Sequence, residues 1–367
     1  MILWLIKRFQ GISDSVTATT TGDSVVYLTA RIAAASLLAF LAAVVLGPFV
    51  IRWLKKRFRE RIASASETLN RLHADKQDTP TMGGVFIMSA VLISTLLFAD
   101  LTSPRVLIAM GVIISFTLLG AWDDWVKQRT DRNGITARQK MLVQCLLAST
   151  AGVLLYFLEP DPEVSQVLFW PVGGGTLTLG WLVIPLAVVV IVATCNSVNL
   201  TDGLDGLAAG CTVSCGAAFV ALCYLSGHRV LADYLSIPYL SGSGELAVIL
   251  GGLVGAMLGF LWFNAHPAQV FMGDAGALPA GALIGLCAVV IRQEILLILI
   301  GGVFVTETAS VLLQVSWYRW KGTRIFRCSP LHNHFVFRGD PETRIVIRFW
   351  IVAALLAIAG LASLKVR

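Results

Sequence analysis

Long apolar runs alternate along the chain with short polar stretches. A run of about 20 apolar residues is long enough to cross the hydrocarbon core of a bilayer as an α-helix. Ten such segments are predicted, at residues 31–54, 82–99, 104–122, 140–158, 180–196, 205–225, 245–263, 275–292, 295–317 and 346–364. The pattern therefore predicts an all-α, polytopic integral membrane protein with about ten transmembrane helices, in which residues 1–367 form a single domain.

Composition supports a membrane protein and argues against nucleic acid as a partner. The chain is 56% hydrophobic and only 14% charged, which is too apolar for a soluble domain. Its net charge of +6 would suggest nucleic-acid binding in a soluble protein, but the cations cluster in particular loops. Such clusters are typical of membrane topology and of attraction to anionic lipid or substrate. The 7 cysteines lack paired Cys-x-x-Cys spacing, so we expect small packing residues and not a metal site.

Lysine and arginine residues gather in the loops that follow the first, third and ninth apolar segments. Cytoplasmic loops of membrane proteins carry an excess of these residues, so the loops after odd-numbered segments are predicted to face the cytoplasm. An even number of spans then places both termini on the outer side. The basic residues of these loops are Lys55, Lys56, Arg57, Arg59, Arg61, Arg71, Lys76, Lys127, Arg129, Arg132, Arg138, Lys140, Arg319, Lys321, Arg324, Arg327, Arg338 and Arg344.

The most unusual stretch, residues 196–206, is a polar island between two apolar runs that contain no Lys, Arg, Asp or Glu. An ionisable residue at the bilayer centre costs about 3 kcal/mol, so it usually marks a wet cavity, an ion path or a binding site. Amides and carboxylates occupy every third position of the island, at Asn196, Asn199, Asp202 and Asp205. This spacing would let neighbours share a helix face, while the glycines of the island allow the backbone to open. A polar turn before a helix can bind an anion or a metal.

Four further polar motifs lie in loops that are predicted to share the cytoplasmic face. They are Thr-Pro-Thr-Met-Gly-Gly at residues 79–84, Asp123-Asp124, Gly-Asp-Ala-Gly at residues 273–276, and His-Asn-His at residues 332–334. Scattered loops have little reason to share one side by chance, and this side is also the basic one. We therefore predict one composite site. Glu307 is weaker evidence, since it lies inside an apolar run, where a buried carboxylate usually has a polar partner or a function.

Each motif also has a plainer interpretation. An acidic pair can be solvated at headgroup level, a Gly-Asp-x-Gly is often an ordinary turn, and the two histidines lack a third zinc ligand. Adjacent acids at a helix end are expected to point in different directions, so that one coordinates or deprotonates while the other orients a partner. Together, however, the carboxylates, amides and basic loops favour phosphoryl transfer between anionic substrates, with Mg²⁺ as the cation that carboxylates prefer.

These residues resemble the polyprenyl-phosphate N-acetylhexosamine-1-phosphate transferases. The similarity lies in Asp123-Asp124, in the polar island, in residues 260–274 and in the histidine loop. Within that superfamily the chain resembles the phospho-N-acetylmuramoyl-pentapeptide-transferase family, also called bacterial translocase I. This narrower resemblance rests on residues 79–84, on residues 324–327 leading into residues 330–332, and on residues 346–350, and it covers about residues 76–367.

The resemblance implies a reaction and a location. Undecaprenyl phosphate would displace UMP from UDP-N-acetylmuramoyl-pentapeptide, with Mg²⁺ as cofactor, to give lipid I, the first lipid intermediate of the peptidoglycan synthesis that underlies cell shape and cell division. The family also implies ten transmembrane helices, a single transmembrane catalytic domain, an active site on the cytoplasmic side of the bacterial inner membrane, and a homodimer.

The resemblance further implies roles for individual residues. Asp274 would hold Mg²⁺. Asp123 and Asp124 would be further candidate ligands that orient or activate the lipid phosphate, with one of them acting as a general base or forming a phospho-aspartyl intermediate. Catalytic residues around the diphosphate would be Asn199, Asp202 and His332. The expected substrate-binding residues are Lys76, Thr79, Lys140, Asn196, Gly203, Leu204, Asp205, Asn264, Phe271, Gln314 and His334, of which Phe271 could stack on uracil.

One departure and two alternatives matter. Asn333 stands where the family has the middle of three histidines, so a role for that histidine does not transfer to this chain. Within the superfamily, an undecaprenyl-phosphate N-acetylglucosamine-1-phosphate transferase is the alternative. From another class, the chain could be an ion-coupled transporter, because intramembrane acids also mark transport paths; transporters, however, place such residues near the midplane and often in two matching halves.

Overall fold

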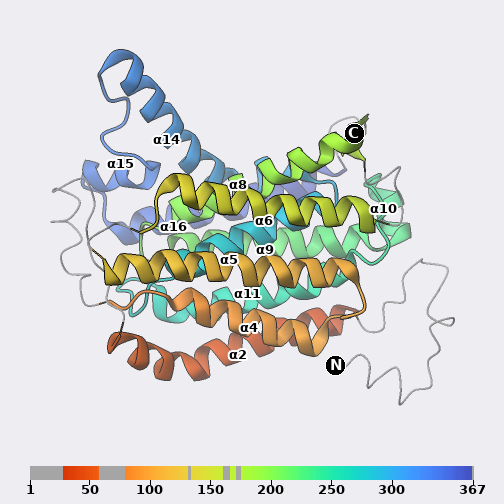
Figure 1. Ribbon diagram of the computed structural model, residues 1–367, viewed down its shortest axis with the longest axis horizontal. Coiled ribbons are helices and arrows are strands. Elements are labelled where there is room, and N and C mark those ends of the chain that lie inside the picture. Colours follow the sequence, from red (N-terminus) through yellow and green to blue (C-terminus); the bar gives the residue numbers. More distant parts are fainter. Residues whose placement is uncertain (1–27, 58–78, 131–133, 160–165, 171–174, 366–367) are drawn as a thin grey trace.

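The computed structural model describes residues 28–57, 79–130, 134–159, 166–170 and 175–365, and in this part of the chain long helices run side by side in a bundle (Figure 1). The helices are α2 (Leu28–Lys55), α4 (Gly83–Phe98), α5 (Pro104–Arg129), α6 (Ala137–Leu158), α8 (Val183–Thr201), α9 (Leu207–Ser226), α10 (Arg229–Leu235), α11 (Gly244–Asn264), α12 (Asp274–Val290), α13 (Glu294–Ile300), α14 (Gly302–Lys321), α15 (Leu331–Arg338) and α16 (Glu342–Ser363). Before α8 come an antiparallel pair of short strands, β1 (Val167–Phe169) and β2 (Thr176–Thr178), and the 3₁₀ turn η2 (Gly180–Leu182).

The helices confirm an all-α, polytopic membrane protein. Among the described residues, 7 helices are long and apolar enough to cross a membrane, and up to 8 spans result if the bent pair α13 and α14 forms one. Helices α4 and α12 are apolar but shorter. The predicted count of ten is therefore not confirmed, because it requires the bent pair and both shorter helices to cross as well.

Two predicted segments differ from the helices that are observed. The third segment was expected to end at residue 122, but α5 continues to Arg129, so Asp123 and Asp124 lie within its last turns. The ninth segment was expected to be one helix, but it breaks at Gly301 and bends by 86° between α13 and α14. Adjacent glycines at Gly301 and Gly302 are a common cause of such a kink. As a result α14 leans out of the bundle (Figure 1).

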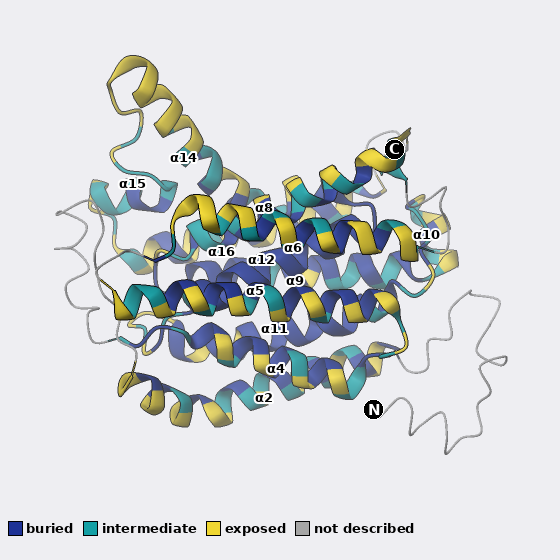
Figure 2. Ribbon diagram, viewed as in Figure 1, coloured by how far each residue is buried: buried dark blue, intermediate teal, exposed yellow. Residues whose placement is uncertain are grey.

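Helices α11 and α12 form the core of the bundle. Every residue of α12 is buried, and most residues of α11 are buried as well (Figure 2). Both helices are rich in glycine and alanine, whose small side chains let the neighbouring helices approach closely. The outer helices α2 and α6 carry exposed apolar side chains such as Leu37, Phe49 and Phe157. This is the inverse of a soluble protein's surface and is expected of helices that face lipid.

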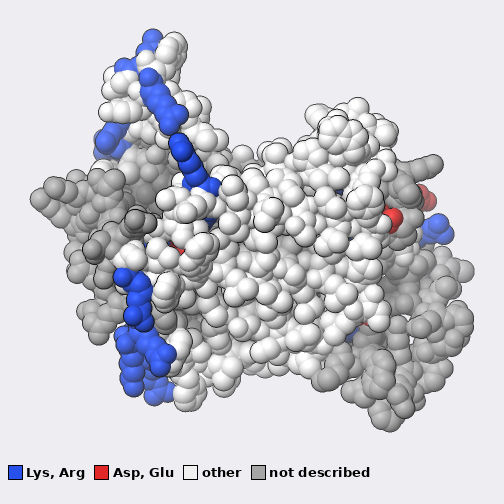
Figure 3. Space-filling model, in the orientation of Figure 1, with Lys and Arg blue, Asp and Glu red and all other residues white. Residues whose placement is uncertain are grey.

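The two ends of the bundle differ in charge. Lysine and arginine side chains gather at the end where α2 and α14 finish, which includes Lys55 and Lys321 (Figure 3). At the opposite end, Arg31 near the start of α2 pairs with Glu245 at 2.6 Å, and Lys365 after α16 donates to the carbonyl of Tyr234. The start of α2 and the end of α16 therefore lie at the same end of the bundle, away from the basic one.

Candidate active site

Three aspartates from two helices form a buried cluster at the basic end of the bundle. Asp123 and Asp124 lie near the end of α5, and Asp274 is the first residue of α12. All three are buried, and each offers a carboxylate oxygen within 4.8 Å of the other two. The structure thus brings together residues that are 150 positions apart in the sequence.

Backbone amides hold two of these carboxylates in place. Asp123 Oδ1 accepts a hydrogen bond from the amide of Ile135 at 2.8 Å, just before α6. Asp124 Oδ2 accepts one from the amide of Ala275 at 3.1 Å. That amide belongs to the first turn of α12, whose positive end favours a negative charge. Each aspartate therefore keeps a second oxygen that can bind a cation.

Two lysines lie against the cluster. Lys127 Nζ is 2.8 Å from Asp123 Oδ2, 3.3 Å from Asp124 Oδ1 and 3.2 Å from Asp274 Oδ1. Lys140, in the first turn of α6, pairs with Asp274 and lies 3.6 Å from Asp123 Oδ2. The expectation that the adjacent acids point in different directions is wrong, because the continuing helix brings Lys127 within reach of both. With two ammonium groups against three carboxylates, the cluster is close to neutral but still favours a cation.

Lys127 is the site residue that the sequence analysis missed. It was interpreted only as one of the basic residues that fix the membrane orientation. The signal was nevertheless present, since Lys127 follows the two aspartates by four and three positions, and residues at this spacing are neighbours on a helix.

The cluster fits a hard divalent cation. Mg²⁺ binds oxygen at about 2.1 Å in octahedral geometry, so two oxygens on one ion lie about 3–4 Å apart, which is within the spacing of these carboxylates. The group consists of carboxylates alone, which favours Mg²⁺ over zinc. Lys127 Nζ now occupies the position between the three carboxylates, so a metal ion bound there requires this ammonium group to move aside.

The loop that leads to Asp274 is held by the segment before α4. The amide of Phe271 donates to the carbonyl of Pro80 at 2.8 Å, and the amide of Gly83 donates to the carbonyl of Phe271 at 2.9 Å. Thr79 Oγ1 lies 3.5 Å from the carbonyl oxygen of Ala268, which is three residues before Phe271 in the same loop. Thr79 and Phe271, both predicted to bind substrate, are therefore neighbours, and they lie a few residues from Asp274.

Gly273 fits tightly beside the cluster. Its backbone has φ +69°, a conformation that glycine adopts at no steric cost. A Cβ atom at this position would lie 2.5 Å from Asp124 Oδ2 and 3.0 Å from Thr81 Oγ1. Only glycine lets this loop approach Asp124 so closely.

The polar island is a helix end followed by a turn. Helix α8 ends at Thr201, and Gly206, with φ +78°, completes a turn from which α9 starts. The predicted sharing of a helix face holds for Asn196 and Asn199 of α8 and is wrong for Asp202 and Asp205, which lie beyond the end of that helix, where the chain opens as the glycines allow. Asp202 is also outside the three-aspartate cluster. Its amide donates to the carbonyl of Asn199 at 3.2 Å, which keeps the helix end closed.

Asn196 pairs with a residue of a neighbouring helix. Its Nδ2 donates to Gln144 Oε1 at 2.7 Å, and Gln144 Nε2 donates back to Asn196 Oδ1 at 3.3 Å. The buried Gln144 amide and the half-buried Asn196 amide satisfy each other and tie α8 to α6. Asn196 therefore holds α8 against α6, the helix that carries Lys140.

Asp205 ties the turn to the loop after α11. Its Oδ2 is 3.0 Å from His266 Nδ1 and accepts the amide of Ala268 at 3.1 Å, while its own amide donates to Glu342 Oε1 at 2.9 Å. Asp205, His266 and Glu342 form a second group whose ligand atoms lie within 4.8 Å of one another. Asp205 is buried, Glu342 is half-buried and His266 is exposed. The hydrogen bonds of Asp205 account for this grouping without a metal ion.

Asn264 supports the same turn from inside. Its Oδ1 accepts the amide of Gly206 at 3.0 Å, and its Nδ2 donates to the carbonyl of Val270 at 2.8 Å. The Trp350 indole of α16 donates to the carbonyl of Gly206 at 3.1 Å. Because the segment from Asn264 continues to Asp274, the turn and the aspartate cluster are parts of one connected framework.

His332 is buried at the start of α15 and pairs with Glu307 of α14. The Glu307 carboxylate accepts the His332 backbone amide at 3.1 Å and lies 3.2 Å from Nδ1. The expectation that Glu307 has a polar partner is confirmed. Because Glu307 engages Nδ1, the Nε2 atom is directed at the polar turn, where a Cβ added to Gly203 would collide with it. Leu204, next in that turn, is buried.

The remaining predicted residues lie elsewhere. Gln314 Oε1 accepts the amides of Ile325 and Phe326, at 3.1 Å and 2.9 Å, and His334 Nδ1 accepts the amide of Arg327 at 3.2 Å. Both side chains therefore shape the loop between α14 and α15. Lys76 lies outside the described residues.

Sequence comparisons identify the family of the chain. Residues 106–292, a stretch that includes Asp123, Asp124 and Asp274, match the family described as glycosyl transferase family 4. Residues 76–88 match signature 1 of phospho-N-acetylmuramoyl-pentapeptide-transferase. The second match contains the segment that holds the loop before Asp274.

Curated relatives cover nearly the whole chain. The phospho-N-acetylmuramoyl-pentapeptide-transferase of Nitratidesulfovibrio vulgaris (strain DP4) is 47% identical over 344 residues, which is 93% of this chain and 94% of that protein. The enzymes of the same name from Oleidesulfovibrio alaskensis and Citrifermentans bemidjiense are 45% and 44% identical over the same shares of both chains. The chain therefore belongs to the phospho-N-acetylmuramoyl-pentapeptide-transferase family and is a membrane-embedded phosphoglycosyl transferase.

Proposed function

We propose that this enzyme transfers phospho-N-acetylmuramoyl-pentapeptide from its UDP conjugate to undecaprenyl phosphate, which releases UMP and forms lipid I. A single observation carries the proposal: three buried aspartates and two lysines converge at the basic end of a membrane bundle. Two anionic substrates repel each other, and such a cluster offers both the cation ligands and the ammonium donors that offset this repulsion.

The proposed step exchanges one diphosphate bond for another. An oxygen of the lipid phosphate attacks the phosphorus that is bonded to the sugar, and the bond from that phosphorus to the oxygen of UMP breaks. Without substrate, Lys127 and Lys140 pair with carboxylates of the cluster. When substrate binds, each ammonium group exchanges a carboxylate partner for a phosphate oxygen. His332 presents Nε2 to the diphosphate beside the polar turn that carries Asp202, just after the end of α8 that carries Asn199.

The cofactor of this proposal is Mg²⁺, held by Asp274 together with Asp123 and Asp124. When bound, it would neutralise phosphate charge during transfer. Asp123 and Asp124 each keep one oxygen on a backbone amide and present the other to the cation, so both are positioned to orient the lipid phosphate. In this proposal the nucleotide lies along Thr79, Phe271, Asn264, Gly203, Leu204 and Asp205. Gln314, His334 and Asn196 support the surrounding segments, and Lys76, outside the described residues, is proposed as a further contact on the family resemblance alone.

The proposed orientation places the aspartate cluster on the cytoplasmic side of the inner membrane, with both termini outward. It rests on the gathering of lysine and arginine side chains at the end of the bundle that holds the cluster (Figure 3).

We further propose that the chain is one catalytic domain and that, as the family resemblance implies, it works as a homodimer. Molar mass measured by light scattering in detergent tests the dimer.

The decisive experiment compares two nucleotide sugars side by side. Purified protein in detergent receives undecaprenyl phosphate, Mg²⁺ and either UDP-N-acetylmuramoyl-pentapeptide or UDP-N-acetylglucosamine, and UMP release is measured. We expect release only with the first sugar. Faster release with the second would assign the chain to the N-acetylglucosamine branch, and ion flux into proteoliposomes without UMP release would favour a transporter.

The role of Asp274 is tested by substitution. Asp274→Asn keeps the size and shape of the side chain but removes the charge that holds the cation, so we expect UMP release to fall by about a hundredfold or more. Asp233→Asn removes an exposed carboxylate of α10 at the opposite end of the bundle and serves as the matched control. Equal activity of the two variants would contradict the assignment of the metal site.

A further inference from the structure

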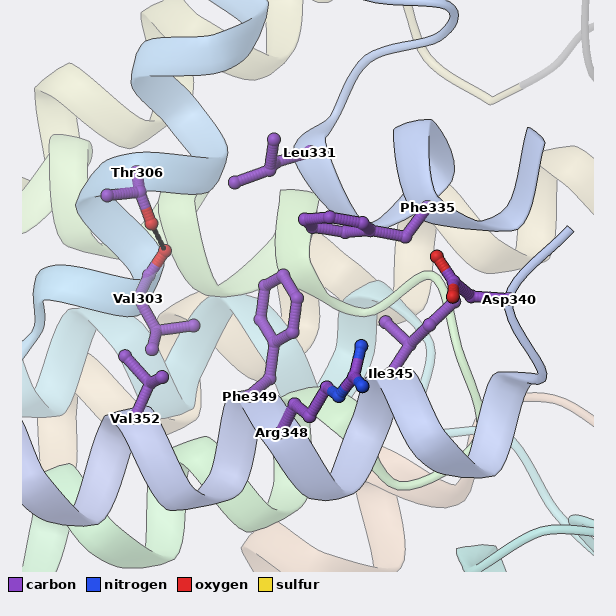
Figure 4. Close-up of a pocket in the computed structure, with 9 residues that line it drawn as sticks. All are labelled: Val303, Thr306, Leu331, Phe335, Asp340, Ile345, Arg348, Phe349 and Val352. Carbon is purple, nitrogen blue, oxygen red and sulfur yellow. Dashed lines mark hydrogen bonds between the residues drawn. The ribbon is translucent and has the colours of Figure 1, made fainter. Parts of the chain in front are cut away.

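A pocket of about 350 Å³ lies between α14, α15 and α16 (Figure 4). None of the three clustered aspartates lines it. Its walls are mainly apolar and include Leu331 and Phe335 of α15 and Phe349 and Val352 of α16. Figure 4 shows the rings of Phe335 and Phe349 on either side of the open space. The pocket is therefore a separate cavity with its own chemistry.

One positively charged side chain, that of Arg348, lines this pocket. Arg348 of α16 lines it, is exposed, and does not form an ion pair within the described part of the chain. The only acid that lines it is Asp340, which is bound by Arg338 Nη2 at 2.5 Å and Nε at 2.6 Å. Because Arg338 neutralises Asp340, the rim of the pocket carries a net positive charge.

The position of the pocket favours a lipid as its occupant. Val352, which lines the pocket on α16, is apolar and exposed, so the pocket opens toward the hydrocarbon of the membrane. Water does not fill an apolar cavity, and an empty one loses packing contacts. Arg348 lies six residues after the start of α16, about 9 Å along the helix, at the depth where basic side chains meet lipid phosphates.

We propose that this pocket binds one acyl chain of an anionic phospholipid of the bilayer, whose phosphate contacts Arg348. The apolar walls fit the chain, and the net positive rim fits the headgroup. Bilayer phospholipids surround the exposed faces of α14 and α16 at all times, so the pocket fills without a dedicated delivery step.

The lipid would act on the active site through two neighbouring helices. Thr306 of α14 and Leu331 of α15 line the pocket, and each directly precedes a member of the Glu307–His332 pair. A chain packed between the helices holds them together and keeps His332 directed at the polar turn. The effect on transfer rests on the proposed function, whereas the binding of the lipid does not.

Binding is tested on the full-length protein in a neutral detergent. Native mass spectrometry measures the affinity for phosphatidylglycerol and for phosphatidylcholine. We expect the anionic lipid to bind about fivefold more tightly, the contribution of one basic side chain near a membrane surface. Arg348→Gln should abolish this preference, whereas Arg344→Gln, one turn earlier on the same helix and outside the pocket, should keep it.

A second pair of variants fills the pocket or leaves it open. Val352→Trp places an indole in the space of the acyl chain, and Leu355→Trp places one on an exposed position of the same helix. We expect Val352→Trp to lower phosphatidylglycerol binding about tenfold and Leu355→Trp to leave it unchanged. Equal binding by both variants would overturn the proposal, as would displacement of phosphatidylglycerol by undecaprenyl phosphate, which would assign the pocket to the substrate.

The effect on the active site is measured in nanodiscs of each lipid. Wild-type protein should transfer faster in phosphatidylglycerol than in phosphatidylcholine, by no more than its binding preference. Val352→Trp, whose indole replaces the acyl chain, should transfer at one rate in both lipids. A wild-type rate that is the same in both lipids, alongside selective binding, would overturn the coupling to His332. Absence of transfer in either lipid, with binding intact, would count against the proposed function alone.

Discussion

At the scale of single residues, the candidate active site is defined by contacts between the carboxylates of three aspartates and the ammonium groups of two lysines. Asp123, Asp124 and Asp274 were predicted from motifs alone, and the fold places them together. Lys127 was not predicted as a site residue, because a lysine after an apolar segment is also what membrane topology requires. Only the contacts of its ammonium group with all three aspartates show its second role.

Lys127 gives the first residue-scale prediction. In the proposed mechanism the ammonium group of Lys127 competes with Mg²⁺ for the same carboxylates, so Lys127→Met should lower the Mg²⁺ concentration needed for half-maximal activity. The maximal rate should fall as well, by about tenfold or more, because a donor to the phosphates is lost. Both quantities come from Mg²⁺ titrations of UMP release.

The control for Lys127 is on the same helix. Arg129→Met removes one positive charge from the exposed last turn of α5, and it should change neither the Mg²⁺ requirement nor the rate. If Lys127→Met required as much Mg²⁺ as the wild type, the ammonium group would not share the site of the metal.

The pair of Glu307 and His332 belongs to the scale of elements, since it joins α14 to α15. Glu307→Ala would leave the buried amide and Nδ1 of His332 without their acceptor. Leaving such groups unsatisfied costs about 1–3 kcal/mol each, so the melting temperature in detergent should fall. UMP release should fall by more than the loss of folded protein explains, because the His332 ring is no longer held with Nε2 toward the polar turn.

A milder variant separates the two effects of Glu307. Glu307→Gln keeps an acceptor for the His332 amide, so the melting temperature should stay close to that of the wild type while UMP release still drops. If Glu307→Gln retained full activity, the carboxylate would be needed only for folding.

Gly206 gives a second prediction at this scale, at the junction of α8 and α9. Its φ of +78° is unfavourable for any other residue, and an added Cβ would lie 3.1 Å from Leu261 Cδ1. Gly206→Ala should therefore destabilise the protein by about 1–2 kcal/mol, as measured by thermal unfolding in detergent. Gly111→Ala, in the middle of α5 where a Cβ meets nothing within 4 Å, should be neutral or slightly stabilising. Equal stability of the two variants would contradict the strain at the turn.

At the scale of the whole molecule, the arrangement of charge predicts a direction in the membrane. A cysteine introduced at Lys321, at the basic end, should react with a membrane-impermeant maleimide only after cells are opened. A cysteine at Asp233, in α10 at the other end, should react in intact cells. Both are placed in a background that carries Cys145→Ser and Cys328→Ser, since these two native cysteines are only partly buried. The reverse pattern would overturn the orientation.

The bundle itself could be predicted in outline from the sequence. Each of the ten predicted segments overlaps a helix or the bent pair, because about 20 apolar residues in a row have few other stable solutions in a membrane. The break at Gly301 could not be predicted, since a Gly-Gly pair permits a kink but packing decides its angle. The end of α5 was also missed, because its last turns are polar yet held by α6 and α12.

The sequence alone determined the class of protein, the basic end and the candidate acids of the site, since these follow from composition and from motifs short enough to be recognised locally. Only the tertiary structure decided which side chains meet. Asp202 and Asp205, only three residues apart, differ in their contacts, because the Asp205 side chain reaches His266 while the Asp202 amide closes the end of α8. The pairs of Lys127 with Asp274 and of Glu307 with His332 join separate helices. Their contacts depend on how the helices pack, which is a property of the whole bundle and not of any local stretch.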